Sequence, residues 1–121
     1  GALDRAVRYV KQREQFNRKL AQFEITKHKI AYMATKVALA RLITYKAAFL
    51  FDKGKADTVL ISMAKMTSAR AAVEVADEAI QLFGGYGYMK ESEVERFSGM
   101  QKLLNFALAT KRCKRILLGK L

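Results

Sequence analysis

Few residues in this chain have the chemistry of a catalytic or binding group, and they lie far apart. Cys113 is flanked on both sides by a pair of basic residues, a setting that lowers the pKa of a thiol and favours the thiolate. Because no base partner accompanies Cys113, we interpret it as a partly exposed, oxidisable thiol without a catalytic role. His28, between Lys27 and Lys29, is expected to be a surface or boundary residue.

One cysteine and one histidine are too few for a Cys/His zinc site, and a single cysteine excludes an intrachain disulfide. The sequence therefore predicts no metal site. The apolar runs are short and broken by Lys or Arg, so we expect neither a membrane span nor a signal peptide. A reducing, aqueous compartment is the expected environment.

The chain has 121 residues, of which 51% are hydrophobic, which suffices for one domain with a buried core. Its formal net charge is +12, so nucleic acid, anionic lipid and phosphate-bearing ligands are the first partners to consider. From Arg96 to Leu121 all seven charged residues are basic. We favour a solvated helix end that complements the helix dipole over nucleic-acid binding, because no nucleic-acid-binding motif accompanies the charge.

Apolar residues recur at helical spacing, and the only glycine cluster lies at 84–87. The pattern predicts a first helix from Ala2 to about Phe16, ending near Asn17, and a second from about Gln22 to Lys53, closed by Gly54 in a left-handed conformation. The second helix should carry a wide apolar stripe; its members are Ile30, Met33, Val37, Ala40, Thr44, Ala47 and Phe51, widened by Leu39, Leu42 and Ile43.

Asp57 is the predicted N-cap of a third helix that ends at the glycines. Its expected buried line is Leu60, Met63, Ala64, Thr67, Ala71, Val75, Ala79 and Leu82. Ser92 and Glu95 form a capping box, so a fourth helix should begin there and continue towards Gly119. Short connections make consecutive helices antiparallel, so the fold class is all-α: an antiparallel up-and-down four-helix bundle, with residues 1–121 as a single domain.

Three segments together resemble the C-terminal helical domain of acyl-CoA dehydrogenases. They are Arg13-Glu14-Gln15-Phe16, Ala21-Gln22-Phe23 and the run from Glu74 to Tyr88, which reads EVADEAIQLFGGYGY. The resemblance extends over essentially the whole chain and agrees with the predicted bundle. In that family a helical domain and a β domain precede this bundle, and together they hold FAD and an acyl-CoA thioester. Both of those domains are missing from this sequence.

The resemblance implies a set of FAD contacts. Arg13 matches an arginine that meets the FAD diphosphate, as suits a guanidinium with paired donors, and Phe16 matches the aromatic residue beside it. Gln81, Gly84 and Gly85 match a glutamine and glycine turn that approach the dinucleotide from a neighbouring subunit, and Thr110 belongs to the same carried-over set. In a lone bundle we interpret these cofactor residues as vestigial and expect no bound cofactor.

Other positions depart from the family pattern. Asn17 and Lys19 stand where glycine and proline are usual, and Glu24 replaces a flavin-contacting glutamine; a carboxylate near a diphosphate is repulsive. The family motif Tyr-Glu-Gly-Thr reads here Ala107 to Thr110, so Leu108 stands where the resemblance places the catalytic base. Leucine cannot accept a proton, so no catalytic residue is predicted in this chain.

The last predicted helix is apolar almost all round, and such a helix needs cover on every side. We therefore expect self-association or a protein partner to bind there; the surface comprises Met100, Leu103, Leu104, Phe106 and Leu108. The leading interpretation is a non-catalytic interaction or scaffold module derived from the dehydrogenase domain. The opening glycine, the missing domains and the lack of proline favour an excised, engineered origin.

Two alternatives remain open. The chain could be a fragment or divergent copy of an FAD-dependent acyl-CoA dehydrogenase, inert without its other domains, or it could bind nucleic acid electrostatically through its basic end. By family, the resemblance implies the cytoplasm or the mitochondrial matrix.

Overall fold

The computed structural model describes residues 1–88 of the chain. Three α-helices make up most of this part: α1 (Ala2–Gln12), α2 (Glu24–Asp52) and α3 (Thr58–Phe83). Two short strands, β1 (Glu14–Gln15) and β2 (Arg18–Lys19), and a 3₁₀ turn, η1 (Leu20–Gln22), connect α1 to α2. A second 3₁₀ turn, η2 (Gly84–Tyr88), follows α3. The described part is helical apart from the short β1–β2 hairpin, which confirms the predicted all-α class.

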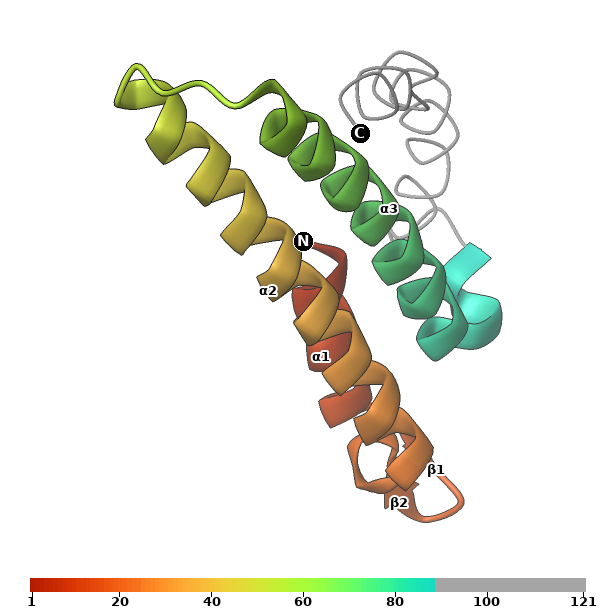
Figure 1. The fold of residues 1–121 in the computed structure, drawn as a ribbon. Helices are drawn as coiled ribbons and strands as arrows, with labels where there is room; N and C mark the ends of the chain where they lie inside the picture. Colours follow the sequence, from red (N-terminus) through yellow and green to blue (C-terminus); the bar gives the residue numbers. More distant parts are fainter. Residues whose placement is uncertain (89–121) are drawn as a thin grey trace.

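The helices α2 and α3 form a long antiparallel hairpin, with the connecting loop at one end (Figure 1). Side-chain pairs fix the antiparallel register: Lys29 meets Glu78 near one end, and Thr44 meets Ser68 farther along. Asp57 caps α3 as predicted, because its carboxylate accepts the backbone N–H groups of Val59 at 2.9 Å and Leu60 at 3.2 Å. Gly54 closes α2 with a φ of +71°, also as predicted.

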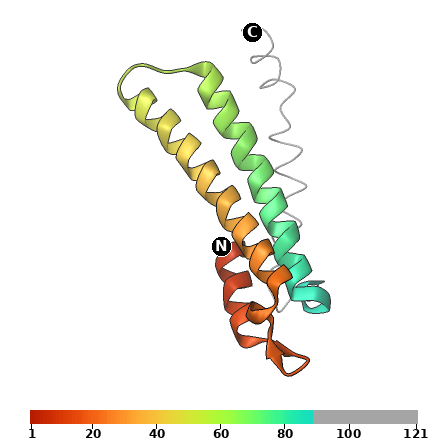
Figure 2. The same ribbon diagram turned by 60° about the horizontal axis from the view of Figure 1, so that its bottom comes forward.

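The short helix α1 lies along the half of the α2–α3 hairpin that is far from the connecting loop (Figure 2). The buried cluster forms where the three helices meet, and its members are Ala6, Met33, Val75, Ala79 and Ile80. Partly buried side chains from all three helices surround it; they are Ala2, Leu3, Ile30, Val37, Leu82 and Phe83. The core is thus concentrated at the end of the hairpin that α1 covers.

The predicted end of the first helix near Asn17 is wrong. The helix ends at Gln12, because Arg13 already has an extended backbone and β1 pairs with β2 in an antiparallel hairpin. Phe16 and Asn17 form the two-residue turn, with φ values of +53° and +59°. Two successive positive φ angles are what a tight hairpin turn requires, and asparagine tolerates that conformation. The spacing of apolar residues along α1 carries no information about this turn.

The predicted buried faces of α2 and α3 are partly wrong. Met63 and Thr67 are exposed, whereas Ser62, Ala76 and Ile80 are buried. On α2, Thr44 and Phe51 are exposed, as are Leu39 and Leu42. Both helices are apolar over much of their circumference, so the spacing of apolar residues could not decide which stripe faces the neighbouring helix.

A cluster of charged and polar side chains joins α2 to α3 outside the core. Glu74 accepts from the Lys36 ammonium at 2.7 Å and from the Tyr32 hydroxyl at 2.9 Å, and Arg70 lies 3.2 Å from its second carboxylate oxygen. The Lys36 hydrogen bond, followed by that of Tyr32, lowers the pKa of Glu74 below its ordinary value. The same hydrogen bond to Glu74, with a smaller contribution from Tyr32, raises the pKa of Lys36.

Several predictions concern residues 89–121, which lie outside the described part. They include the capping box at Ser92, the fourth helix and the basic final segment. The predicted partner surface, formed by Met100, Leu103, Leu104, Phe106 and Leu108, falls there too, as do Thr110 and Cys113. The four-helix count and the single-domain assignment stay predictions. Within residues 1–88, no helix is long and apolar enough to cross a membrane.

Candidate functional site

A cavity of about 470 Å³ lies where the end of α1 meets the end of α3. It brings together four of the predicted cofactor contacts, although 68 residues separate Arg13 from Gln81 in the sequence. The lining residues are Tyr9, Arg13, Gln15, Leu20, Gln81, Leu82, Phe83, Gly84, Gly85 and Tyr86. No acidic side chain is among them, and Arg13 supplies the positive charge.

The position of Arg13 is fixed by its backbone. Its N–H donates to the carbonyl of Tyr9 at 2.8 Å, and its own carbonyl accepts from the N–H of Leu20 at 2.9 Å. The guanidinium carbon lies 5.2 Å from the centre of the Tyr86 ring, within the range of a cation–π interaction. Arg13 is therefore anchored at the junction of α1 and β1, with its charge beside the glycine turn.

An aromatic pair joins the two helix ends that form this cavity. The rings of Tyr9 and Phe83 stack with centroids 4.2 Å apart and an interplanar angle of 17°. The Tyr9 hydroxyl also donates to the Phe83 carbonyl at 3.5 Å. This pair holds α1 against the last turn of α3, so Arg13 and the glycine turn keep a defined separation. The sequence pattern did not indicate Tyr9 and Tyr86 as lining residues, because only the contact between α1 and α3 brings them to the cavity.

Different structural constraints, either backbone conformation or packing, act on the glycines at the end of α3. Gly84 has φ +59° and ψ −136°, a conformation that side-chain-bearing residues avoid. A Cβ on Gly87 would lie 2.8 Å from the Ile80 carbonyl oxygen, so packing excludes a side chain there. A Cβ on Gly85 would meet no atom of residues 1–88 within 4 Å, and φ is not positive at that residue. Packing within this described part therefore leaves the space above Gly85 open to a ligand.

Phe16, the remaining predicted contact within residues 1–88, does not line the cavity. It occupies the tip of the β1–β2 hairpin, where 89% of its surface is exposed. Its backbone has a positive φ, and an aromatic side chain so exposed buries little apolar surface within residues 1–88. Its prediction as a cofactor contact stays untested.

The departures from the family pattern at Asn17, Lys19 and Glu24 lie away from the cavity. Glu24 begins α2, and its carboxylate oxygen lies 3.6 Å from Nε2 of His28, one helical turn later. None of these three residues lines the cavity. The repulsion expected between Glu24 and a bound phosphate therefore does not apply to a phosphate in this cavity. His28 is exposed, as predicted, and its acidic neighbour Glu24, which was not predicted, lies one helical turn earlier. Within residues 1–88, no group of acidic, histidine and cysteine side chains could hold a metal ion.

Comparison with known proteins assigns the family. Residues 1–108 match the family described as "Acyl-CoA dehydrogenase, C-terminal domain". The chain belongs to this family of helical domains, which confirms the resemblance found in the sequence.

Curated relatives include enzymes that act on thioesters of coenzyme A. The chain is 36% identical over 120 residues to cyclohexane-1-carbonyl-CoA dehydrogenase of Geobacter metallireducens, covering 99% of this chain and 32% of that protein. It is 46% identical over 96 residues to subunit CarC of the caffeyl-CoA reductase-Etf complex of Acetobacterium woodii, covering 79% of this chain and 25% of that protein. The chain thus spans a quarter to a third of the length of these relatives.

Solved structures agree with this assignment. Butyryl-CoA dehydrogenase of Megasphaera elsdenii superimposes with a TM-score of 0.91 at 37% identity, covering 98% of this chain and 31% of that one. A probable acyl-CoA dehydrogenase of Mycobacterium abscessus gives a TM-score of 0.93 at 35% identity, covering 98% of this chain and 32% of that one. Both likenesses are to one helical part of a larger enzyme.

Proposed function

We propose that this chain acts as the C-terminal helical domain of an FAD-dependent acyl-CoA dehydrogenase and supplies one wall of the dinucleotide site. The observation that carries the proposal is the cavity that gathers Arg13, Gln81, Gly84 and Gly85 at the meeting of α1 and α3. FAD, when bound, supplies the hydride acceptor of the dehydrogenation. The contribution of this domain is binding and orientation.

The chemistry of the cavity suits a diphosphate. A guanidinium offers paired hydrogen-bond donors to phosphate oxygens, and Arg13 is already held at the cavity by its backbone hydrogen bonds. The cavity lining contains no carboxylate to repel an anion. The open space at Gly85 lets a ligand approach the backbone closely, and the Gln81 side chain can donate and accept hydrogen bonds.

A cavity of about 470 Å³ lies in the lower part of the roughly 300–1,000 Å³ range of pockets for drug-sized molecules, and a whole FAD molecule is larger than such ligands. We therefore propose that this domain contacts the phosphate part of FAD, while other parts of the enzyme hold the remainder. On its own the domain should bind FAD only weakly, and it should not dehydrogenate an acyl-CoA.

The test is a titration of the ¹⁵N-labelled chain with FAD, ADP and pyrophosphate, followed by NMR. We expect the largest shifts at the amides of Gly84 and Gly85, the side-chain amide of Gln81 and the Nε–H of Arg13, with a dissociation constant of about 1 mM or weaker. Arg13→Gln should abolish these shifts, because it removes the charge and the paired donors.

Arg18→Gln is the matched control. Arg18 lies on β2 of the hairpin that follows Arg13 and carries the same charge, but it does not line the cavity. If both variants reduced binding equally, the interaction would depend on overall charge and the site would be wrong. Shifts centred elsewhere, or none with any of the three ligands, would also contradict the proposal.

A second proposal concerns association between copies of the chain, and it rests on the exposed apolar side chains of α2. We propose that a second copy of the chain covers an apolar stripe on this helix, which we call the α2 stripe. Its members are Leu39, Leu42, Tyr45 and Phe49, each more than half exposed. Residues spaced by three and four lie on one side of a helix, so these side chains form one continuous surface. This adds to the interaction role predicted for the last helix, which lies outside residues 1–88.

A further inference from the structure

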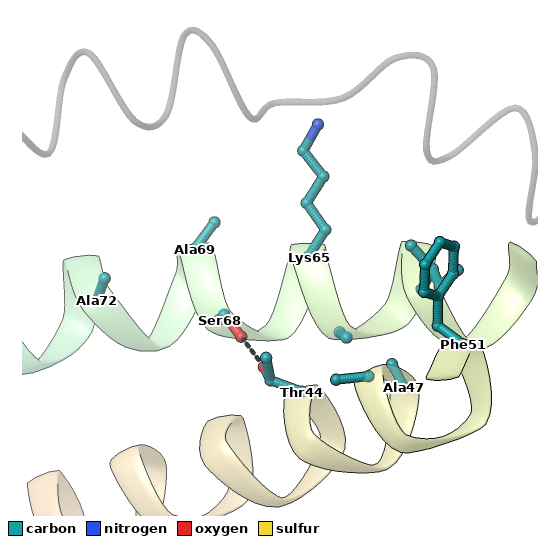
Figure 3. A pocket seen from close by; sticks show the side chains of 10 residues that line it. Thr44, Ala47, Phe51, Lys65, Ser68, Ala69 and Ala72 are labelled. Atoms are coloured by element: carbon teal, nitrogen blue, oxygen red, sulfur yellow. Dashed lines mark hydrogen bonds between the residues drawn. The ribbon is translucent and has the colours of Figure 1, made fainter. Parts of the chain in front are cut away.

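A second cavity, of about 600 Å³, lies in the seam between α2 and α3 and differs in its chemistry from the cavity at Arg13. Alanines make up half of its lining, and Lys65 points away from the seam (Figure 3). The hydroxyls of Thr44 and Ser68 hydrogen-bond to each other at 2.9 Å. The seam therefore presents no polar group comparable to the Arg13 guanidinium, whose surroundings carry the inference below.

The Arg13 guanidinium has no anionic partner among residues 1–88. None of the ion pairs in this part of the chain includes Arg13, and no lining residue of its cavity is acidic. Its guanidinium carbon instead lies 5.2 Å from the centre of the Tyr86 ring. A cation over a ring is attracted by the charge distribution of the ring and not by a hydrogen bond, so the N–H donors of Arg13 stay available to phosphate oxygens.

The backbone hydrogen bonds of Arg13 fix its main chain but not its guanidinium, because several rotatable side-chain bonds separate the two. Ordering a long side chain costs rotamer entropy, and a ligand that must order it on binding has a lower affinity. A contact that already holds the guanidinium in the free protein removes part of this cost. The Tyr86 ring is the contact in a position to do so.

Two structurally constrained glycines fix the position of Tyr86. Gly84 turns the chain at the end of α3 with a φ of +59°, and Gly87 packs so closely that a Cβ on it would lie 2.8 Å from the Ile80 carbonyl oxygen. Tyr86 lies between these glycines in η2, lines the cavity and is 51% exposed. The turn thus presents the ring to Arg13 without burying it.

We propose that Tyr86 is a positioning residue: its ring holds the Arg13 guanidinium beside the glycine turn before a phosphate binds. This inference rests on the proposed function, since the ligand is the phosphate part of a dinucleotide. The ring and not the hydroxyl carries the effect, because the attraction arises from the π system. An exposed cation–π pair is strong enough to change a dissociation constant about two- to fivefold.

The test compares Tyr86→Leu, which removes the ring, with Tyr86→Phe, which removes only the hydroxyl. In the ligand-free ¹⁵N-labelled chain, Tyr86→Leu should move the Arg13 Nε–H resonance towards its random-coil position and lower its ¹H–¹⁵N NOE, because the side chain gains freedom. In a titration with pyrophosphate, Tyr86→Leu should raise the dissociation constant about two- to fivefold. Tyr86→Phe should match the wild type in all three measurements.

Tyr45→Leu is the matched control, since Tyr45 is 70% exposed on α2 and does not line the cavity. It should leave the Arg13 resonance unchanged, and urea denaturation should show that all variants keep the fold. An Arg13 NOE or a dissociation constant that Tyr86→Leu leaves unchanged would overturn the inference, as would a Tyr86→Phe variant that behaves like Tyr86→Leu. A wild type that binds no pyrophosphate would contradict the proposed function, while the NOE of Arg13 in the free chain would still decide whether Tyr86 holds its guanidinium.

Discussion

Three glycines follow α3 within four residues, yet a different physical constraint acts on each. At Gly84 the constraint is the backbone, at Gly87 it is the 2.8 Å approach to the Ile80 carbonyl oxygen, and at Gly85 neither applies. A glycine that the fold does not require is a candidate for contact with a ligand. This distinction separates the structural from the functional part of the GGYG turn.

Substitution by alanine tests this distinction. Gly87→Ala should destabilise the chain by about 1–3 kcal/mol, because the new methyl group is forced against the Ile80 carbonyl. Gly85→Ala should leave the free energy of unfolding within about 0.5 kcal/mol of wild type, since its methyl group enters open space. The measurement is urea denaturation of both variants. A large loss at Gly85 would mean that the fold requires this glycine, and the argument for ligand approach would fail.

Gly85→Ala also probes binding. Gly85→Ala should weaken the NMR shifts caused by FAD without unfolding the chain, because its methyl group occupies the space that we assign to the ligand. Unchanged shifts with Gly85→Ala would place the phosphate elsewhere in the cavity.

At the scale of the elements, the α2–α3 hairpin is held by small apolar contacts and by polar contacts, among them a cluster centred on Glu74. The carboxylate of Glu74 interacts with Lys36, Arg70 and Tyr32, and three-quarters of its side-chain surface is buried. Because the pKa of this carboxyl is lowered in the folded chain, its contribution to stability is fully present above its unfolded pKa of about 4.5. That contribution is lost as the pH falls through the lower, folded pKa.

Glu74→Gln should therefore change the pH dependence of unfolding. At neutral pH we expect a loss of about 1 kcal/mol, typical of a partly exposed ion pair, and the difference from wild type should shrink as the pH falls from about 5 to 3. The measurement is urea denaturation at several pH values. Glu78→Gln is the matched control, since it removes a single ion pair, that with Lys29 at 2.8 Å. A difference that stayed constant with pH would show that the loss comes from packing and not from charge.

At the scale of the whole molecule, two features oppose each other. The α2 stripe favours association, whereas a net charge of +12 makes copies of the chain repel. Salt screens that repulsion, with a Debye length of about 8 Å at physiological ionic strength. Association through the stripe should therefore become stronger as salt is added, which is the opposite of what electrostatic binding of nucleic acid would show.

Sedimentation equilibrium of the 121-residue chain tests this prediction. Leu42→Lys should shift the chain towards monomer, because it places a charge within the α2 stripe. Ile25→Lys is the control, since Ile25 is 67% exposed on the same helix but lies outside the stripe. A monomeric wild type at high salt, or equal effects of the two variants, would rule out the stripe as a contact between copies.

The sequence by itself determined the two long helices α2 and α3 and the family. The N-cap at Asp57, the left-handed glycine at 54 and the ends of α2 and α3 are local features, because hydrogen bonding and φ preferences act within a few residues. The run from Glu74 to Tyr88 carried the family resemblance, and the match over residues 1–108 confirms it. The hairpin at Phe16 and Asn17 was missed, because an apolar period carries no information about a turn that follows it.

Only the tertiary structure decided which surfaces meet. Arg13 and Gly85 share a cavity because Tyr9 stacks on Phe83, a contact between helix ends that no local pattern encodes. Likewise, α2 and α3 are apolar over much of their circumference, so the spacing of their apolar residues was compatible with several packing faces. In the structure, Met63 and Leu42 lie on the exposed side. The physical reason is that the hydrophobic effect has no direction. Close packing and specific pairs such as Lys36 with Glu74 therefore determine which of several similar helix faces is buried.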